Sequence, residues 1–361
     1  MQASTRLVSL DVFRGITMAA MVVVNNPGDW GHVYAPLLHA PWHGWTPTDL
    51  IFPFFLFIVG VSITLSKRSA SAGSILKRAA VILGVGLFLS GFPRFDLATW
   101  RIPGVLQRIA LCYAAAALIF GRSRRPAVIG AVAAALMVGY WAVMALVPAP
   151  GGTAGDLSPE GNLGAFIDRA LMSGHLWKPR WDPEGLLSTV PAIATTLLGI
   201  LAGLWIGGSA APARKAGLMA LAGVAAIALG YLWHIAFPIN KSLWTSSYVI
   251  FSAGAAALFL ALCYWAIDVM GWRWWTRPFV ILGVNALALY ALAALLASTL
   301  GSISLTAAGG RTVSAQGWIY AGVFEPLASP KNASLLYALA NLAVLFLVLF
   351  WMYRRRIFLR A

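Results

Sequence analysis

The chain has 361 residues, of which 60% are hydrophobic and 10% are charged, and its mean hydropathy is +0.80. This composition excludes an ordinary water-soluble domain, because so few charged residues cannot cover so much apolar surface. The formal net charge is +15. The basic residues are distributed between apolar runs in the pattern of a membrane protein, so we predict no nucleic-acid partner.

Apolar runs long enough to cross a membrane recur along the whole chain. A helix needs about 20 residues to cross about 30 Å of hydrocarbon. The runs are continuously apolar and rich in Ala, Leu and Gly, which excludes spanning strands. We predict an all-α fold, a polytopic helical bundle with about ten spans in one transmembrane domain over residues 1–361. The predicted spans are 8–26, 47–66, 74–92, 103–120, 126–148, 187–207, 215–237, 247–270, 278–300 and 333–353.

The first run is predicted to be a retained helix, because it lacks a small-residue cleavage site and contains Asp11 and Arg14. These two residues are three apart on one helix face. Two interpretations stay open: the pair neutralises itself, or Arg14 also meets an anionic ligand from the cytoplasm.

The basic residues predict the orientation of the bundle. With a cytoplasmic N-terminus and ten spans, 16 Lys and Arg residues fall inside and 8 outside, with Arg14 and Arg108 within spans. The positive-inside rule therefore predicts two cytoplasmic termini. Segments 67–78 and 121–125 should face the cytoplasm, and 28–46 and 149–186 should face outward. The basic clusters themselves are interpreted as orientation signals and lipid headgroup contacts.

Three of the five histidines lie between the first two spans, at positions 32, 39 and 43. Histidine titrates near neutral pH, so such a cluster is a candidate for proton transfer. Asn25 ends the first span and Asp49 begins the second on the same side, so both can meet His39 at one depth. Each residue also has a structural alternative. Asn25 could cap the first helix, Asp49 could be a helix-start residue favoured by the helix dipole, and His39 could be a loop residue that faces water.

Other polar residues in or near the spans carry weaker signals. Arg108 lies inside the fourth span beside Gln107, which favours a polar binding patch over a side chain that reaches to the interface. Pro41 prevents a regular helix through His39 and His43, so we predict no metal site there. The two cysteines, at positions 112 and 263, fall within spans and are expected to be packing residues.

Two outward segments are long. Residues 149–186 are rich in Gly, Pro and acidic residues, and GAFIDRALM within them is predicted to form a short interfacial helix. Residues 301–332 contain QGWIYAGVFEPL, which is too short to span and is expected to be re-entrant or to cover the bundle. No broken helices stand at matching positions in two halves, which weakens a transporter interpretation.

Five blocks, in order along the chain, resemble the membrane-bound heparan-α-glucosaminide N-acetyltransferase family, and within it the bacterial members grouped with N-acetylglucosamine use. The blocks are LDVFRGITMAAMVVVN, HAPWHGWTPTDLIFPFFLFIVG, RIPGVLQRIALCY, WDPEGLLSTVPAIATTLLGILAG and FPINKSLWTSSYV. The resemblance implies transfer of an acetyl group from cytoplasmic acetyl-CoA to the amine of a glucosamine-type sugar outside the bacterial inner membrane. Relative to the animal enzymes, the chain carries an additional His32 and lacks a large N-terminal lumenal segment, so we expect a minimal transmembrane core.

The resemblance also implies the roles of the site residues. His39 is expected to be the catalytic base, Asp49 to orient it, and Asn25 to donate to the thioester oxygen. Acetyl-CoA is the expected co-substrate, with no metal, and its 3′-phospho-ADP part is expected to meet the cationic inner loops and Arg14. The sugar and membrane lipid are the expected partners; a homodimer stays open. The residues expected at the cofactor are Arg14, Gln107 and Arg108, and those expected at the sugar are Trp42, His43, Asn240 and Lys241.

Two alternatives to an N-acetyltransferase stay open. One is a transporter for an amino sugar such as N-acetylglucosamine, which needs neither acetyl-CoA nor a base. The other is an O-acyltransferase of an envelope polysaccharide, which would use the same donor and the same histidine.

Overall fold

The computed structural model describes residues 7–66, 71–306 and 310–359. Part of the segment predicted to face the cytoplasm, residues 67–70, lies outside the described residues. Nine described helices are long and apolar enough to span a membrane, and a bent helix pair adds up to one more. They are α1 (Val8–Asn25), α2 (Ile51–Leu65, preceded by the 3-10 turn Pro47–Leu50), α3 (Ala72–Gly91), α4 (Val105–Arg122), α5 (Pro126–Leu146), α7 (Leu186–Gly207), α8 (Pro212–His234), α9 (Ser246–Tyr264, continued by the π-helical turn Trp265–Val269) and α13 (Pro330–Arg354). The predicted all-α polytopic bundle is confirmed.

The predicted span 278–300 is not one straight helix. It consists of α10 (Arg277–Val284) and α11 (Ala286–Ser302), which meet at an angle of 79°. Asn285 between them is fully buried in a non-helical conformation, and its amide binds the backbone of Ile357 and Leu359 at 3.0 Å each. The C-terminal segment therefore packs against the break and supplies hydrogen-bond partners to the buried Asn285 side chain there.

The remaining elements lie outside the spans. The predicted interfacial helix exists as α6 (Leu163–Met172). Segment 301–332 begins with a short antiparallel hairpin, β1 (Ser304–Thr306) and β2 (Thr312–Ser314), followed by α12 (Ala315–Ile319) and the π-helical turn Tyr320–Phe324. The hairpin was not expected from the sequence, but it leaves the fold overwhelmingly helical.

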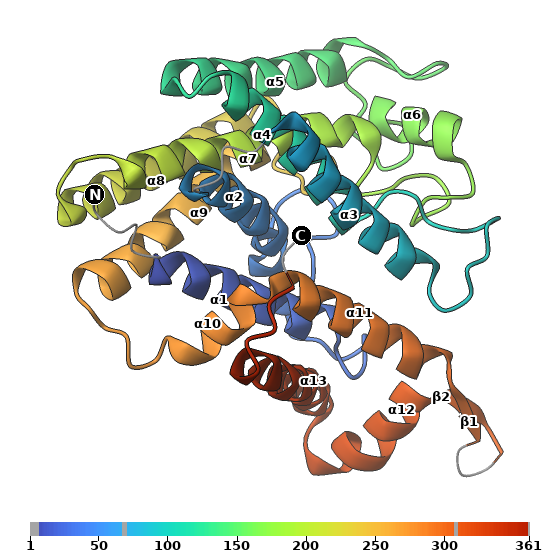
Figure 1. Cartoon of the computed structure of the whole chain (residues 1–361). Helices are drawn as coiled ribbons and strands as arrows, with labels where there is room; N and C mark the ends of the chain where they lie inside the picture. Colours follow the sequence, from blue (N-terminus) through green and yellow to red (C-terminus); the bar gives the residue numbers. More distant parts are fainter. Residues whose placement is uncertain (1–6, 67–70, 307–309, 360–361) are drawn as a thin grey trace.

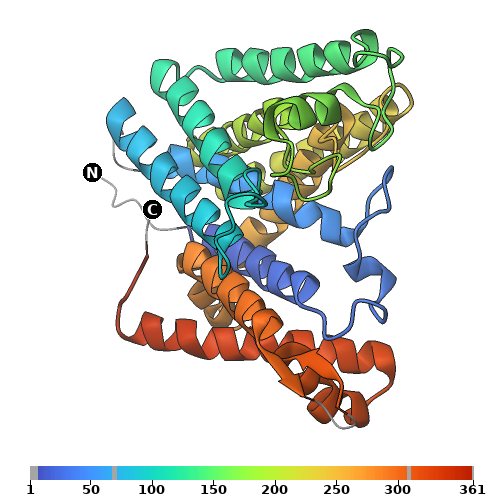
Figure 2. The ribbon, with the colours of Figure 1, turned by 90° about the vertical axis from the view of Figure 1, so that its right-hand side faces the viewer.

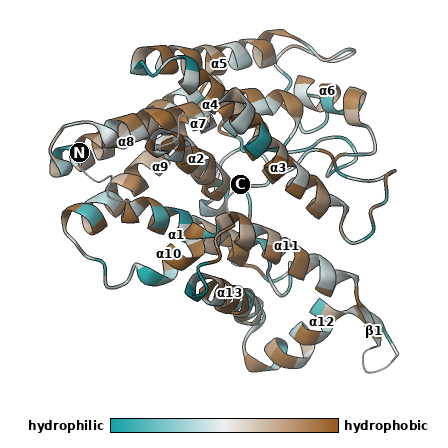
Figure 3. Cartoon of the chain, in the orientation of Figure 1, coloured by the Kyte–Doolittle hydropathy of each residue, from teal (hydrophilic) through white to brown (hydrophobic). Residues whose placement is uncertain are grey.

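The bundle places its loops at two opposite ends. Figure 1 shows α1, α2 and α9 near the centre, with α10, α11 and α13 on one side and α3, α4 and α5 on the other. In Figure 2, the first and last described residues lie at one end, and segment 28–46 and the loop ahead of α6 lie at the opposite end. Apolar residues dominate the helices in Figure 3. Both free cysteines, Cys112 and Cys263, are buried within this apolar packing.

Close packing of α2 on α7 fixes the helix that leads to the histidine segment. A Cβ added at Gly60 would lie 2.0 Å from the Thr196 carbonyl oxygen, and one at Gly199 would lie 2.1 Å from the Phe57 carbonyl oxygen. Only glycine permits such an approach of two helix backbones. The N-terminal end of α2, with Asp49 just before it, is therefore held in a defined position.

Candidate active site

A single cavity of about 990 Å³ extends along α2 from its first turn to its last residues. One end, which we call the histidine end, is lined by His39, Asp49 and Lys241. The other, the arginine end, is lined by Arg14, Arg78 and Arg124. Apolar residues line the middle, among them Phe52, Phe55, Val59, Leu287 and Tyr290.

His39 and Asp49 form a hydrogen-bonded pair at the histidine end. His39 Nδ1 lies 2.6 Å from Asp49 Oδ1, and Asp49 is only 1% exposed. A carboxylate accepts hydrogen bonds and cannot donate them, so Nδ1 carries the proton. This leaves Nε2 of the neutral ring as the nitrogen that can accept a proton.

The sequence around Asp49 explains why its carboxylate is fixed. Pro47 begins a 3-10 turn, and Thr46 and Asp49 make a capping box around it. Asp49 Oδ2 accepts hydrogen bonds from the backbone nitrogens of Ala40 (3.0 Å) and Thr46 (2.9 Å). The hydroxyl of Tyr248 on α9 donates to the Asp49 carbonyl. The carboxylate is thus oriented before any substrate arrives.

Asn25, the last residue of α1, also lines the cavity. Within the described part of the chain, its side chain has no hydrogen-bond partner, so its amide is available to a ligand. The structure therefore brings Asn25, His39 and Asp49 to one cavity, as the sequence predicts. Among the same described residues, no group of three or more His, Cys, Asp or Glu is placed to hold a metal ion.

The segment between α8 and α9 contributes Lys241 to the histidine end. Its Nζ lies 3.3 Å from His39 Nε2 and 3.5 Å from His39 Nδ1. Neighbouring Asn240 does not line the cavity; its Oδ1 accepts from the Leu243 nitrogen (2.8 Å), and its Nδ2 lies 3.3 Å from His43 Nδ1. Of the residues predicted to bind sugar, Lys241 reaches the cavity directly, whereas Asn240 and His43 support the loop that carries it.

His43 stands in a different environment from His39. It is not part of the cavity wall, and burial, followed by the nearby His234, lowers the pKa of His43 below its ordinary value. The two histidines of the HAPWH block are therefore separated by their surroundings, since only His39 faces both the cavity and a carboxylate.

Tryptophans form one wall of the histidine end. Trp42, Trp177 and Trp181 all line the cavity, with ring centroids 5.1 Å apart for Trp42 and Trp181 and 6.0 Å apart for Trp177 and Trp181. Trp42 Nε1 donates to the Leu157 carbonyl at 2.9 Å, which ties this wall to the long loop before α6. Trp42, which the sequence proposes as a sugar-binding residue, thus lines the cavity together with two further tryptophans.

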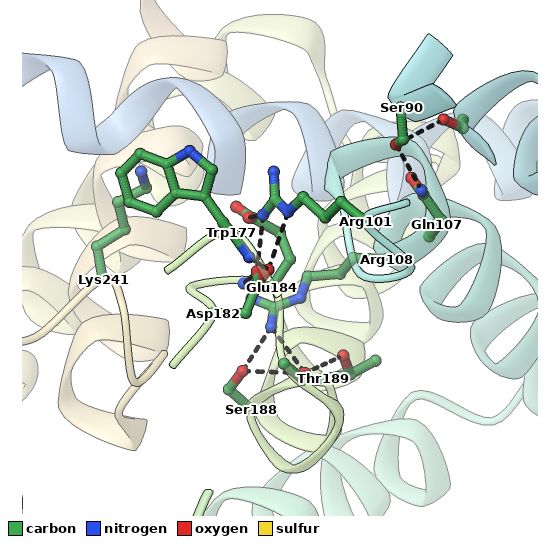
Figure 4. A network of polar contacts seen from close by, with 12 residues as sticks. Ser90, Arg101, Gln107, Arg108, Trp177, Asp182, Glu184, Ser188, Thr189 and Lys241 are labelled. Carbon is green, nitrogen blue, oxygen red and sulfur yellow. Dashed lines mark hydrogen bonds and ion pairs between the residues drawn. The ribbon is translucent and has the colours of Figure 1, made fainter. Parts of the chain in front are cut away.

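An ion network of Arg101, Asp182 and Glu184 adjoins Trp177 (Figure 4). Arg101 donates to Asp182 at 2.9 and 2.7 Å and to Glu184 at 2.6 Å, and Asp182 also accepts from the Trp177 nitrogen at 2.8 Å. Although burial opposes it, pairing with the two carboxylates raises the pKa of the Arg101 guanidinium. Arg101 and Glu184 line the cavity. Both were missed from the sequence, where WDPEG marked a conspicuous acidic segment just before a span.

Neither Gln107 nor Arg108 lines the cavity. Arg108 is 1% exposed; its NH2 donates to the Gly185 carbonyl (3.0 Å) and to the Ser188 hydroxyl, and its guanidinium lies 5.1 Å from the Trp244 ring centroid. Gln107 donates to the Ser90 hydroxyl at 3.2 Å. These contacts join α4 to α3 and α7. The cofactor role predicted for the two residues gains no support from their positions.

The arginine end gathers three cations. Arg14 donates to the Ser62 hydroxyl at 2.8 Å and to Asp11 at 3.3 Å, so its pairing with Asp11 and its access to the cavity coexist. Arg78 donates to the Tyr113 hydroxyl at 3.4 Å, and Arg124 lies 5.5 Å from the Phe120 ring centroid. No carboxylate among the described residues pairs with Arg78 or Arg124. The sequence predicts cationic inner loops that meet lipid headgroups and the CoA nucleotide, but it does not single out Arg78 or Arg124 within them.

Residues 6–235 match the family profile described as heparan-alpha-glucosaminide N-acetyltransferase, catalytic. The chain belongs to this family. Among curated proteins, the human enzyme named heparan-alpha-glucosaminide N-acetyltransferase is 30% identical, over 74% of this chain and 49% of the human protein. The mouse enzyme of the same name is 29% identical, over 74% of this chain and 50% of the mouse protein.

The chain thus spans about half the length of the curated relatives it matches. Membership and the apolar helices together make it a multi-pass membrane protein of an acetyltransferase family. The matched range contains Asn25, His39 and Asp49, together with Arg78 and Arg124. Segment 236–245, which carries Lys241, lies beyond it.

Proposed function

We propose that this protein transfers an acetyl group from acetyl-CoA to the amine of a glucosamine-type sugar. The observation that carries the proposal is the continuous cavity, which joins a histidine–carboxylate pair at one end to guanidinium groups at the other. Family membership supports acetyl transfer in general. The donor, the acceptor and the sidedness are our proposals.

The arginine end suits the phosphates of CoA. Arg78 and Arg124 have no carboxylate partners among the described residues, and Arg14 points into the same space. Guanidinium groups bind phosphates through paired, charge-assisted hydrogen bonds. The 15 residues of α2 span about 22 Å at 1.5 Å per residue, so the pantetheine arm is proposed to extend along the apolar middle towards His39.

At the histidine end, His39 Nε2 is proposed to take the proton of the acceptor amine as its nitrogen attacks the thioester carbonyl carbon. The C–N bond forms, the C–S bond breaks, and the proton passes from His39 to the departing thiolate. Asp49 stabilises the imidazolium that exists between these steps, and the Asn25 amide donates to the carbonyl oxygen as negative charge builds there. A neutral amine is already a good nucleophile, so no covalent acetyl-enzyme is needed.

The chemistry of the histidine end favours an amino sugar. The tryptophan wall of Trp42, Trp177 and Trp181 offers apolar ring surfaces for the face of a sugar. Glu184 and Asp49 pair with Arg101 and His39, and their carboxylates can also accept from an amine of the ligand. A hydroxyl can donate to the same carboxylates, but it carries no positive charge for them to stabilise. This difference favours N-acetylation over O-acylation.

The charge asymmetry of the loops supports an orientation for the reaction. The arginine end lies near segments 71–78 and 121–125, which we propose to be cytoplasmic in a bacterial inner membrane. Acetyl-CoA would then enter from the cytoplasm, and the sugar would be acetylated on the outer side.

The test is mass spectrometry of glucosamine after incubation with the purified protein, reconstituted in lipid, and isotopically labelled acetyl-CoA. Labelled N-acetylglucosamine is expected from the wild-type protein, and the His39→Ala variant serves as the matched control. A labelled O-acetyl product would show that the protein acetylates a hydroxyl rather than an amine, and would contradict the proposed N-acetylation. Movement of glucosamine into proteoliposomes without donor, and without any acetylated product, would favour the transporter and overturn the proposal.

A further inference from the structure

Lys241 places a primary amine directly against His39. Its Nζ is 3.3 Å from His39 Nε2, and the same cavity wall contains Asp49 and Glu184. This is the group that the proposed reaction uses as acceptor, an amine beside the nitrogen that takes its proton. In the structure, the enzyme's own side chain therefore stands where the sugar amine is proposed to react.

The backbone around Lys241 is held rigidly. The Asn240 nitrogen donates to Thr245 Oγ1 (3.0 Å), the Thr245 nitrogen donates to the Asn240 carbonyl (3.2 Å), and the Trp244 nitrogen donates to the Lys241 carbonyl (3.1 Å). Trp244 is 1% exposed. Because this turn is anchored, the fold fixes the backbone from which the Lys241 side chain reaches His39.

The surroundings of Lys241 also favour its reactive form. Burial lowers the pKa of Lys241 most strongly, and the nearby cations Arg108 and Arg101 lower it further. The carboxylates of Glu184 and Asp49 raise it, but the net result is a pKa below the ordinary lysine value. A lowered pKa leaves a larger fraction of neutral amine at a given pH, and only the neutral amine attacks a thioester.

We propose that Lys241 is an internal acetyl acceptor, modified by the enzyme itself when acetyl-CoA is bound and no sugar occupies the histidine end. This inference rests on the proposed acetyl transfer. The Lys241 nitrogen bonds to the acetyl carbon, the C–S bond breaks, and the amine proton passes through His39 to the thiolate. The products are Nε-acetyl-lysine at position 241 and free CoA, so no further reactant is required.

The modification has a consequence for activity. Acetylation removes the positive charge beside His39 and adds an acetyl group to the space of the acceptor. Enzyme that meets the donor without a sugar should therefore inactivate slowly, and sugar should protect it by occupying the histidine end and taking the acetyl group.

The experiment is peptide mass spectrometry of the full-length, lipid-reconstituted protein after incubation with isotopically labelled acetyl-CoA alone. Label is expected on Lys241, growing with time and faster at higher pH, in step with loss of activity on glucosamine. Lys178 is the internal control, because it lines the same cavity but stacks on Trp177, with Nζ 4.5 Å from that ring centroid. The His39→Ala variant should label Lys241 about 10²–10⁴-fold more slowly.

Protection by the acceptor needs no variant: glucosamine added with the donor should suppress labelling of wild-type Lys241. If Lys241 stays unmodified after incubation with acetyl-CoA alone, in a preparation that does acetylate glucosamine, this inference is overturned and the proposed function stands. Equal labelling of Lys178 and Lys241, unaffected by glucosamine, would show chemical acetylation by the thioester and would also overturn it. Absence of both acetylated glucosamine and acetylated Lys241 would overturn the proposed function as well.

Discussion

At the scale of residues, Asp49 holds the His39 ring in one orientation, because its carboxylate accepts from Nδ1 of that ring. The sequence allows this pair to be predicted, since His39 lies between the first two spans and Asp49 begins the second. Arg78, Arg124 and Glu184 could not be predicted, since each joins the cavity only when helices far apart in sequence pack together. A basic residue at a helix end has the same sequence signature whether it meets lipid or lines a cavity. Only the tertiary arrangement separates the two cases.

His39→Ala is expected to reduce the rate of glucosamine acetylation about 10²–10⁴-fold, because a positioned base is lost. His43→Ala should have a much smaller effect, since His43 lies outside the cavity wall, where its ring packs against Trp42 and its Nδ1 lies 3.3 Å from Asn240 Nδ2. Initial rates at saturating donor and acceptor test this pair of variants. An equal loss of activity in both variants would show that the substitutions disturb the loop that carries both histidines, and not that a catalytic base is lost.

Arg124→Ala is expected to raise the KM for acetyl-CoA about 10–100-fold, the equivalent of one lost charge-assisted hydrogen bond of about 1.5–3 kcal/mol. Neighbouring Arg125 is exposed and does not line the cavity, so Arg125→Ala is the matched control. Acetyl-pantetheine, which lacks the nucleotide, should be used equally well by both variants. A KM for acetyl-CoA that Arg124→Ala leaves unchanged would remove this residue from the donor site.

At the scale of elements, the helices and α6 followed from apolar runs and from local sequence, but the bend between α10 and α11 did not. No proline marks it, and Asn285 occupies the break because the distant residues Ile357 and Leu359 supply its hydrogen-bond partners. Leu359 also lines the arginine end. A feature that depends on contacts 72 and 74 residues apart has no local signal in the sequence.

Helix α6 is attached to α7 through a carboxyl group with an unusual pKa. Asp168 Oδ1 accepts from the Leu186 nitrogen at 2.9 Å, and burial raises the pKa of Asp168 from 3.8 to about 6. Because the folded-state pKa lies above the unfolded one, the native protein binds the proton more tightly. Ionisation of Asp168 therefore lowers the free energy of unfolding. This loss is absent below about pH 4, grows as the pH rises towards about 6, and reaches roughly 3 kcal/mol above it.

Asp168→Asn keeps an acceptor for the Leu186 nitrogen and removes this charge. Relative to wild type, the variant should gain thermal stability as the pH is raised from 5 to 7, and thermal unfolding in detergent at both pH values measures the difference. A stability difference independent of pH would show that the pKa of Asp168 is not raised in the folded protein.

At the scale of the whole molecule, composition and apolar runs predicted a polytopic helical bundle because the bilayer admits few solutions. The cavity is a different kind of property. It exists because α2, α4 and the α10–α11 pair contribute facing residues at both ends of the bundle, so its length and its arginine end emerge only from the packed structure. The proposed reaction depends on which end faces which compartment.

The orientation itself is open to a direct test in a background without Cys112 and Cys263. The exposed Ala72, at the start of α3, and the exposed Ala154, in the long loop before α6, are suitable single-cysteine positions. The Ala154→Cys variant should react with a membrane-impermeant maleimide in intact cells, and the Ala72→Cys variant only after lysis, because the positive-inside rule places residues 67–78 in the cytoplasm. The reverse pattern would turn the arginine end away from cytoplasmic acetyl-CoA, and the donor could then not enter by the route proposed here.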